Sequence, residues 1–158
     1  MLSDNAKEKI DVLLTKYPTK KAALLPALWV AQADNQGWVP RQAMKDIAEY
    51  LDLPAADVEG VATFYTMYNK APVGKYHVEV CHNIVCMAVG ADALIDHLGE
   101  KLGIDKGETT PDKKFTLNGA ECLGACANAP CMMVGDVYYE DLDFAKADAI
   151  IDDLARKA

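Results

Sequence analysis

The chain has 158 residues, 51% of them hydrophobic, and a formal net charge of -8 at pH 7. This length is enough for one domain, or two small ones, to bury a core without disulfide staples. The acidic balance disfavours nucleic acid as a partner, because no basic face is available to displace counterions from phosphates. A well-solvated surface is the simplest explanation of the charge itself.

Targeting signals are the next feature. No segment joins a basic stretch to an apolar run and a small-residue cleavage site, and no apolar run approaches the roughly 20 residues that span a bilayer. We therefore expect a cytoplasmic protein. The chain has five cysteines, an odd number, and in a reducing compartment a cluster of cysteines indicates metal or redox chemistry more than disulfides.

The first part of the chain shows the period of helices. Ser3 can cap a first helix that extends to about Tyr17 and that the following proline stops. The next segment, 22–37, begins apolar nearly all round and belongs in the middle of a bundle. Pro26 lies inside it, so we expect either a kink or a helix that begins close to Leu25 with the proline in its first turn.

Two further helices begin at Pro40 and Pro54. Four helices with short loops predict a small bundle. The segment "NKAPVGK", residues 69–75, follows it and contains a proline and a glycine where the period changes. We therefore expect a helical domain at 1–71 and a second domain at 72–158.

The sequence pattern of the second domain predicts a compact α/β arrangement. In chain order it contains a strand, an amphipathic helix, a second strand, a hairpin about Gly135 and Asp136, and a last helix. The expected fold class is therefore α+β or α/β, with the helical bundle first. The expected segments are 75–81, 89–103, 113–122, 131–140 and 143–156.

Four of the five cysteines form two local pairs. Cys81 and Cys86 have the spacing C-x4-C; after 35 residues, Cys122 and Cys126 have the spacing C-x3-C. Each pair lies where a predicted strand ends, so the topology can bring the two loops together at one end of a sheet. A [2Fe-2S] cluster suits two such pairs, because each iron takes two thiolates beside the two bridging sulfides.

Zinc is the main alternative, since four thiolates also complete a tetrahedral structural site. Zinc sites usually have tighter pairs, most often C-x2-C, so the spacing favours iron-sulfur. Free redox thiols are a third interpretation, although a thioredoxin-type dithiol would need C-x-x-C. A Rieske centre would need two histidine ligands, and only His82 lies beside a candidate cysteine. We expect His82, His77 and His97 to be surface or strand residues.

Apolar and small residues around the thiols can shield a cluster from water. Gly124 allows the backbone to approach and to point N–H groups at sulfur. Ordinary core and turn packing accounts for each of these residues individually as well. The apolar and small set is Ile84, Val85, Leu123, Ala125, Ala127, Pro130 and Met132.

The fifth cysteine, Cys131, begins an apolar segment, "CMMV". We expect it to be a small buried hydrophobe beside the site. Ligation by Cys131 instead of one of the four paired cysteines is the alternative.

These segments resemble a known family. "VCHNIVC" and "ECLGACANAP" are similar to the thioredoxin-like [2Fe-2S] ferredoxins. "LPALWVAQADNQGWVP" and "VEGVATFYTMYNKAPVGKYHVEVC" are similar to one branch of that family, the E subunits of NADH:quinone oxidoreductase, respiratory complex I. The similarity extends from about Lys9 to Leu154. Two positions depart from the family pattern: Cys131 stands where an apolar residue is usual, and Gly135 where asparagine is common.

The resemblance implies a small helical bundle followed by a thioredoxin-like domain that holds one [2Fe-2S] cluster. It carries the four ligands over onto Cys81, Cys86, Cys122 and Cys126. The same branch includes diaphorase subunits of NAD-linked hydrogenases and formate dehydrogenases, which are the alternative parent complexes.

An expected function follows from what the cofactors can do. A cluster carries one electron while NADH delivers a hydride, so a flavin must divide the pair. The chain has no G-x-G-x-x-G after a predicted strand, so we expect it to depend on another subunit for FMN and NADH. The resemblance supplies that partner, a flavoprotein subunit.

The chain would then be an electron-transfer subunit with no catalytic residue of its own. Its expected place is the peripheral arm on the cytoplasmic side of the inner membrane, without insertion into the membrane. Tyr65 and Tyr68 are candidate partner contacts, although aromatic residues at helix spacing usually belong to a core. A zinc-stabilised adaptor and a thiol oxidoreductase are the alternatives from other functional classes.

The reduction potential of such a cluster is expected to be low. Four thiolates and two sulfides make the oxidised site negative, so reduction adds an electron to a group that already repels it. The neighbouring carboxylates of Glu79 and Glu121 would oppose reduction further, and backbone N–H groups directed at sulfur would favour it.

Overall fold

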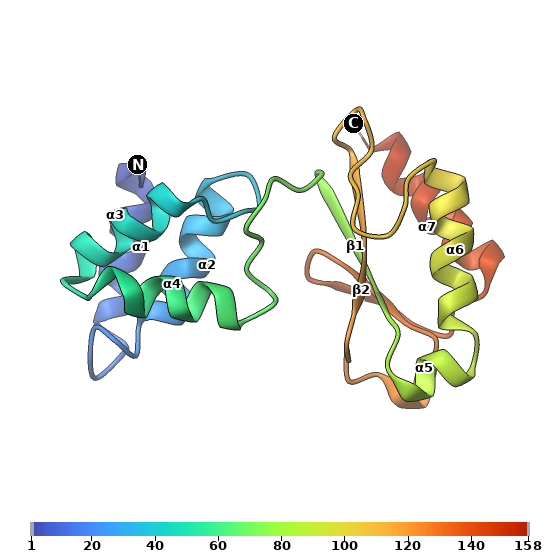
Figure 1. Cartoon of the computed structure of the whole chain (residues 1–158), viewed down its shortest axis with the longest axis horizontal. Coiled ribbons are helices and arrows are strands. Elements are labelled where there is room, and N and C mark those ends of the chain that lie inside the picture. Colours follow the sequence, from blue (N-terminus) through green and yellow to red (C-terminus); the bar gives the residue numbers. More distant parts are fainter. Residues whose placement is uncertain (1, 158) are drawn as a thin grey trace. The chain divides into compact units, whose positions relative to one another are not determined.

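The computed structural model describes residues 2–157 (Figure 1). The chain divides into two compact units between Pro72 and Val73. Within the described residues, no helix combines the length and the apolar character needed to cross a membrane.

The first unit is a bundle of the four expected helices. Their apolar faces enclose a core that includes Ile10, Leu28, Ile47, Leu51 and Val58, all fully buried. The helices are α1 (Asp4–Leu14), α2 (Leu24–Asp34), α3 (Arg41–Leu51) and α4 (Ala55–Phe64).

The starts of these helices follow the predicted signals. Ser3 caps α1, and its side chain accepts a hydrogen bond from the backbone N–H of Ala6. Helix α2 begins at Leu24 with Pro26 as its third residue, so the proline lies in the first turn, where a missing N–H costs no intrahelical bond. Of the two expectations for this proline, the second is confirmed.

Two helices end earlier than expected. Helix α1 ends at Leu14 instead of Tyr17, and the Thr15 hydroxyl donates to the Val12 carbonyl at this end. The segment "PAADVEGVATFYTMY" predicts that the fourth helix continues through Tyr68, but α4 ends at Phe64 and Tyr68 turns into the core of the bundle.

Tyr68 is fully buried and its hydroxyl donates to the Leu25 carbonyl at 2.8 Å. It is therefore part of the bundle core, and of the two candidate partner contacts only Tyr65 is exposed.

The second unit is built on a mixed four-stranded sheet with the order β2-β1-β3-β4. Strands β1 and β2 are parallel, whereas β3 is antiparallel to both β1 and β4. The strands are β1 (Tyr76–Cys81), β2 (Phe115–Ala120), β3 (Met132–Val134) and β4 (Val137–Tyr139).

Helices α6 (Ala91–Leu102) and α7 (Phe144–Arg156) pack side by side on one face of this sheet (Figure 1). The core between them includes Val78, Leu98 and Leu117, all fully buried. A helical bundle followed by a mixed sheet with helices confirms the predicted fold class.

The predicted hairpin is also present, with Gly135 in the turn between β3 and β4. Its φ of +59° lies in the left-handed region that glycine adopts without strain and asparagine tolerates. Glycine therefore suits this turn.

One element was not predicted. A short helix, α5 (Ile84–Ala88), follows β1 and contains Cys86. The Asn83 side chain caps it by accepting from the backbone N–H of Ile84 at 2.9 Å.

Candidate metal centre

Three segments bring cysteines to one edge of the sheet. The parallel register pairs Cys81 with Ala120, so β1 and β2 end at the same edge and Cys122 follows just beyond. Strand β3 is antiparallel to β1, so it begins at that edge, directly after Cys131. Helix α5 lies at the same end of the unit as the loop after β2 (Figure 1).

Three of the five thiols are gathered there in a buried group. The Sγ atoms of Cys81, Cys86 and Cys131 all lie within 4.8 Å of one another. The Cys86 and Cys131 sulfurs are 4.0 Å apart. These side chains are 3%, 2% and 0% exposed, so the group is closed to bulk water.

The other two cysteines lie on an exposed loop. Cys122 follows β2, and Cys126 begins the short 3-10 helix η1 (Cys126–Asn128). This loop comes close enough to the buried group for the backbone N–H of Leu123 to lower the pKa of the Cys81 thiol. The structure thus brings Cys81 and Cys86 together, and the four-cysteine ligand set stays a prediction.

The burial of Cys131 was predicted, but its position beside two other cysteines was not. It is fully buried at the start of an apolar strand, as expected for a small hydrophobe. Its proximity to Cys81 and Cys86 was not foreseen, because it depends on the pairing of β3 with β1. A hairpin signal in the sequence predicts that β3 pairs with β4, but it does not predict which strand pairs with the other side of β3.

The Cys81 thiol is placed to become a thiolate. Burial raises its pKa, but hydrogen bonds from the backbone N–H groups of Asn83 and Leu123, and from the neighbouring thiols, more than offset this, so the pKa lies below its ordinary value. The same N–H groups favour a metal-bound thiolate. The sulfur at the end of β1 is therefore the most acidic of the buried three.

The two other buried thiols are shifted the opposite way. Burial, and then the proximity of Cys81, raise the pKa of Cys86, although the backbone N–H of Cys131 donates to its sulfur. Burial and the neighbouring sulfurs raise the pKa of Cys131 to about 12. Both are neutral thiols at pH 7 until a cation compensates their charge.

The exposed loop is held by bonds at both of its ends. The Tyr138 hydroxyl donates to the Leu123 carbonyl at 3.1 Å, and the Asn128 side chain donates to Asp141 at 3.0 Å. Gly124 has a φ of +76°, with no atom within 4 Å of where a Cβ would lie. Glycine adopts this left-handed backbone conformation without strain.

The predicted shield of apolar residues is only partly present. Met132 is buried, and Leu123 and Ala125 pack against the domain core. In contrast, Ile84 and Val85 on α5 are 72% and 39% exposed. Alone, the chain leaves these two side chains to solvent.

The three histidines lie outside the buried thiol group. The His82 ring packs over Gly119, where an added Cβ would lie 2.8 Å from the ring. His77 hydrogen-bonds to the Asn118 side chain. His97 stacks on Phe144, on the helical face of the domain.

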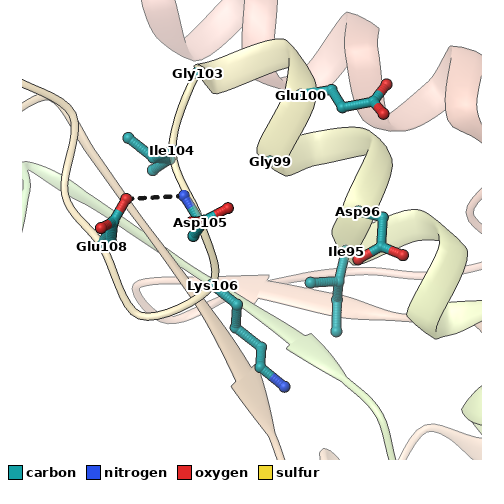
Figure 2. Close-up of a pocket in the computed structure, with 9 residues that line it drawn as sticks. All are labelled: Ile95, Asp96, Gly99, Glu100, Gly103, Ile104, Asp105, Lys106 and Glu108. Carbon is teal, nitrogen blue, oxygen red and sulfur yellow. Dashed lines mark hydrogen bonds between the residues drawn. The ribbon is translucent and has the colours of Figure 1, made fainter.

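A hollow lies between α6 and the loop that follows it (Figure 2). Four carboxylates line it, and only Lys106 opposes their charge. Such a lining repels phosphate groups, so the hollow is unsuited to a nucleotide. Gly99 on its wall serves packing, because a Cβ there would lie 2.9 Å from the Ile104 carbonyl oxygen.

Comparison with known proteins gives a consistent result. The thioredoxin-like [2Fe-2S] ferredoxin family model matches residues 10–155. The chain is 43% identical over 146 residues to NADH-quinone oxidoreductase E subunit 2 of Rhizobium meliloti (strain 1021), covering 92% of this chain and 86% of the relative. It is 47% identical over 144 residues to the NADH-quinone oxidoreductase E subunit of Rickettsia bellii (strain RML369-C), covering 90% and 86%.

A solved structure is similar as well. A chain in the crystal structure of an NAD+-reducing [NiFe]-hydrogenase in the air-oxidized state superposes with a TM-score of 0.72 at 25% identity. The match covers 85% of the present chain but only 23% of the hydrogenase chain.

Proposed function

The chain belongs to the thioredoxin-like [2Fe-2S] ferredoxin family, and from this membership we propose that it is the [2Fe-2S] electron-transfer subunit of an NADH-quinone oxidoreductase. Its partner would be an FMN- and NADH-binding flavoprotein subunit. The identities of 43% and 47% to relatives from that oxidoreductase support this parent complex over a hydrogenase. Its place would be the peripheral arm on the cytoplasmic side of the membrane.

The single observation that carries the proposal is the convergence of cysteine-bearing segments at one edge of the sheet. Cys81 and Cys86 would hold one iron, and Cys122 and Cys126 the other. Cys131 lies with the first pair, so it would add a third thiolate to an iron already served and leave the second iron short. The exposed pair is therefore the better source of the remaining ligands.

The protein's own residues would tune this site. A [2Fe-2S] cluster, when bound, supplies one-electron chemistry. The N–H groups of Asn83 and Leu123 stabilise negative charge on the Cys81 sulfur, which favours the reduced state. The buried side excludes water, and the exposed side lies toward the loop of Cys122 and Cys126.

The exposed apolar face of α5 supports an obligate partner. Ile84 and Met87 on α5 are 72% and 50% exposed, and Val89, directly after the helix, is 53% exposed, all beside the candidate site. Apolar side chains grouped on one short helix are typical of an interface. A partner that covered them would also remove water from the neighbouring site.

The test is purification without air followed by visible and EPR spectroscopy and metal analysis. Two irons and two acid-labile sulfides per chain, with an EPR signal on reduction, are the expected result. Colourless protein with stoichiometric zinc would favour a zinc-stabilised adaptor instead. A metal-free chain with a reactive cysteine would favour a thiol oxidoreductase.

A further inference from the structure

The buried thiol group contains one cysteine, Cys131, that is not a ligand of the proposed cluster. We infer that Cys81, Cys86 and Cys131 form a binding site for one thiophilic divalent cation of the Zn²⁺ class when the chain holds no cluster. The site shares two cysteines with the proposed cluster and replaces the exposed pair with Cys131. It rests on the geometry of these three residues and does not require the proposed function.

The spacing of the three sulfurs fits a single ion. Thiolates lie about 2.3 Å from a tetrahedral zinc, which places them about 3.8 Å from one another. The Cys86 and Cys131 sulfurs are already 4.0 Å apart, and no pair in the group exceeds 4.8 Å. Small side-chain rotations are therefore enough to close the site.

The backbone around the site is already fixed. The Cys81 N–H donates to the Cys131 carbonyl at 3.0 Å, which ties β1 to the start of β3. Asn83 caps α5 and so sets the place of Cys86. Little chain entropy is lost on binding, because hydrogen bonds of the protein itself hold these elements in place.

The chemistry of the donors selects the ion. The group has three sulfurs and no carboxylate or imidazole, a set that favours soft ions such as Zn²⁺, Cd²⁺ and Co²⁺ over Mg²⁺ and Ca²⁺. Binding releases three protons from the three thiols and leaves a site of net charge -1. The ion thus compensates the charge that burial alone disfavours.

Occupation of this site and insertion of the cluster exclude each other. Both need the thiolates of Cys81 and Cys86, so a zinc-loaded chain cannot accept a cluster until the ion leaves. Zinc should therefore slow cluster reconstitution in proportion to its occupancy.

The test is an anaerobic Co²⁺ titration of the full-length, reduced, cluster-free chain, followed by the sulfur-to-cobalt charge-transfer bands. We expect one Co²⁺ per chain, displaced by Zn²⁺. Cys131→Ala should weaken binding by at least the roughly 10- to 100-fold that losing a supporting group near a metal costs. The matched controls Cys122→Ala and Cys126→Ala should bind as the unchanged chain does.

The opposite pattern overturns the inference: weak binding in the Cys122 and Cys126 variants with normal binding in Cys131→Ala would assign the ion to the four paired cysteines. Far-ultraviolet circular dichroism checks that each variant is folded. X-ray absorption of the unsubstituted chain with Zn²⁺ keeps the test open if Cys131→Ala does not fold. Three sulfurs bound to the ion support the site, whereas four sulfurs contradict it.

The Co²⁺ titration tests the cation site and the cluster assay tests the proposed function, so either proposal can fail while the other stands. A chain that binds Co²⁺ through Cys131 but never assembles a cluster would keep this site and refute the proposed function. A chain that assembles a cluster but ignores Cys131 in the titration would do the reverse.

Discussion

The backbone N–H of Cys81 donates a 3.0 Å hydrogen bond to the carbonyl of Cys131, joining the last residue of β1 to the residue that precedes β3. This bond places a fifth thiol beside the first cysteine pair. It makes Cys131 a structural neighbour of the proposed cluster without making it the best ligand.

The first prediction concerns the ligand set. Alanine at any one of Cys81, Cys86, Cys122 or Cys126 should abolish the cluster or make it unstable, because an iron would lose a thiolate. Cys131→Ala should keep the visible and EPR spectra nearly unchanged. Serine is a weaker test, since its oxygen can replace a thiolate. Loss of the cluster in the Cys131 variant alone would reverse the assignment.

The second prediction concerns the flavin. The isolated chain should show no NADH oxidation with artificial electron acceptors, since the hydride must first reach a flavin. Mixing with the flavoprotein subunit should allow NADH to reduce the cluster, followed by EPR. FMN bound to the purified chain, together with NADH-dependent activity, is the result that would contradict this.

The third prediction concerns the exposed face of α5. Ile84→Asp should weaken association with the flavoprotein subunit, because it would bury a carboxylate in an apolar contact. Binding can be measured by isothermal titration calorimetry on chains of equal cluster content. Val12→Asp is the control, since Val12 is 55% exposed on α1 in the other unit. Equal binding by both variants would remove α5 from the interface.

The fourth prediction concerns the charge of Glu121. This residue precedes Cys122 and is exposed, so Glu121→Gln should raise the midpoint potential slightly, more at low salt than at high salt. A redox titration followed by EPR measures the shift. Glu8→Gln, exposed in the helical bundle, should leave the potential unchanged. A potential that falls in Glu121→Gln would mean that lost hydrogen bonds outweigh the removed charge.

The fifth prediction concerns Tyr68 in the bundle. Tyr68→Phe removes the hydrogen bond to the Leu25 carbonyl and should lower the free energy of unfolding by about 1 kcal/mol. Urea unfolding measures this, with the exposed Tyr65→Phe as the matched control. An equal loss in both variants would show that the hydrogen bond of Tyr68 contributes nothing particular.

The pH dependence gives that prediction a sign. Burial, and then the neighbouring Tyr65, raise the pKa of Tyr68 from 10.0 to about 12, so the folded bundle prefers the neutral phenol. The neutral Tyr68 side chain makes its full contribution to the free energy of unfolding below pH 10, and this contribution is lost as the pH rises toward 12. Tyr68→Phe should flatten the alkaline loss of stability.

Local signals were sufficient for much of the fold. The cap at Ser3 and the prolines before α3 and α4 fixed the helix starts, since each acts within one turn of its own position. The hairpin about Gly135 followed from alternation around a turn residue. By contrast, α5 is only five residues long, too short for a periodic pattern to show.

Long-range contacts account for what was missed at the site. Spacing paired Cys81 with Cys86 and Cys122 with Cys126, because each pair is local in the chain. The contact of Cys131 with the first pair depends on which strand β3 joins, and no local pattern encodes that choice. The outward direction of Ile84 likewise depends on the unforeseen α5.

The gathering of three thiols at the ends of folded elements also ties metal binding to folding. The core of Val78, Leu98 and Leu117 lies between the sheet and its helices, and Cys81, Cys86 and Cys131 belong to the same buried cluster. The pairing of β3 with β1 therefore builds the sheet and gathers these sulfurs in the same step. Newly made chains would then compete for iron and zinc as folded acceptors, and the cell's relative supply of the two metals at that moment would decide how many become electron carriers.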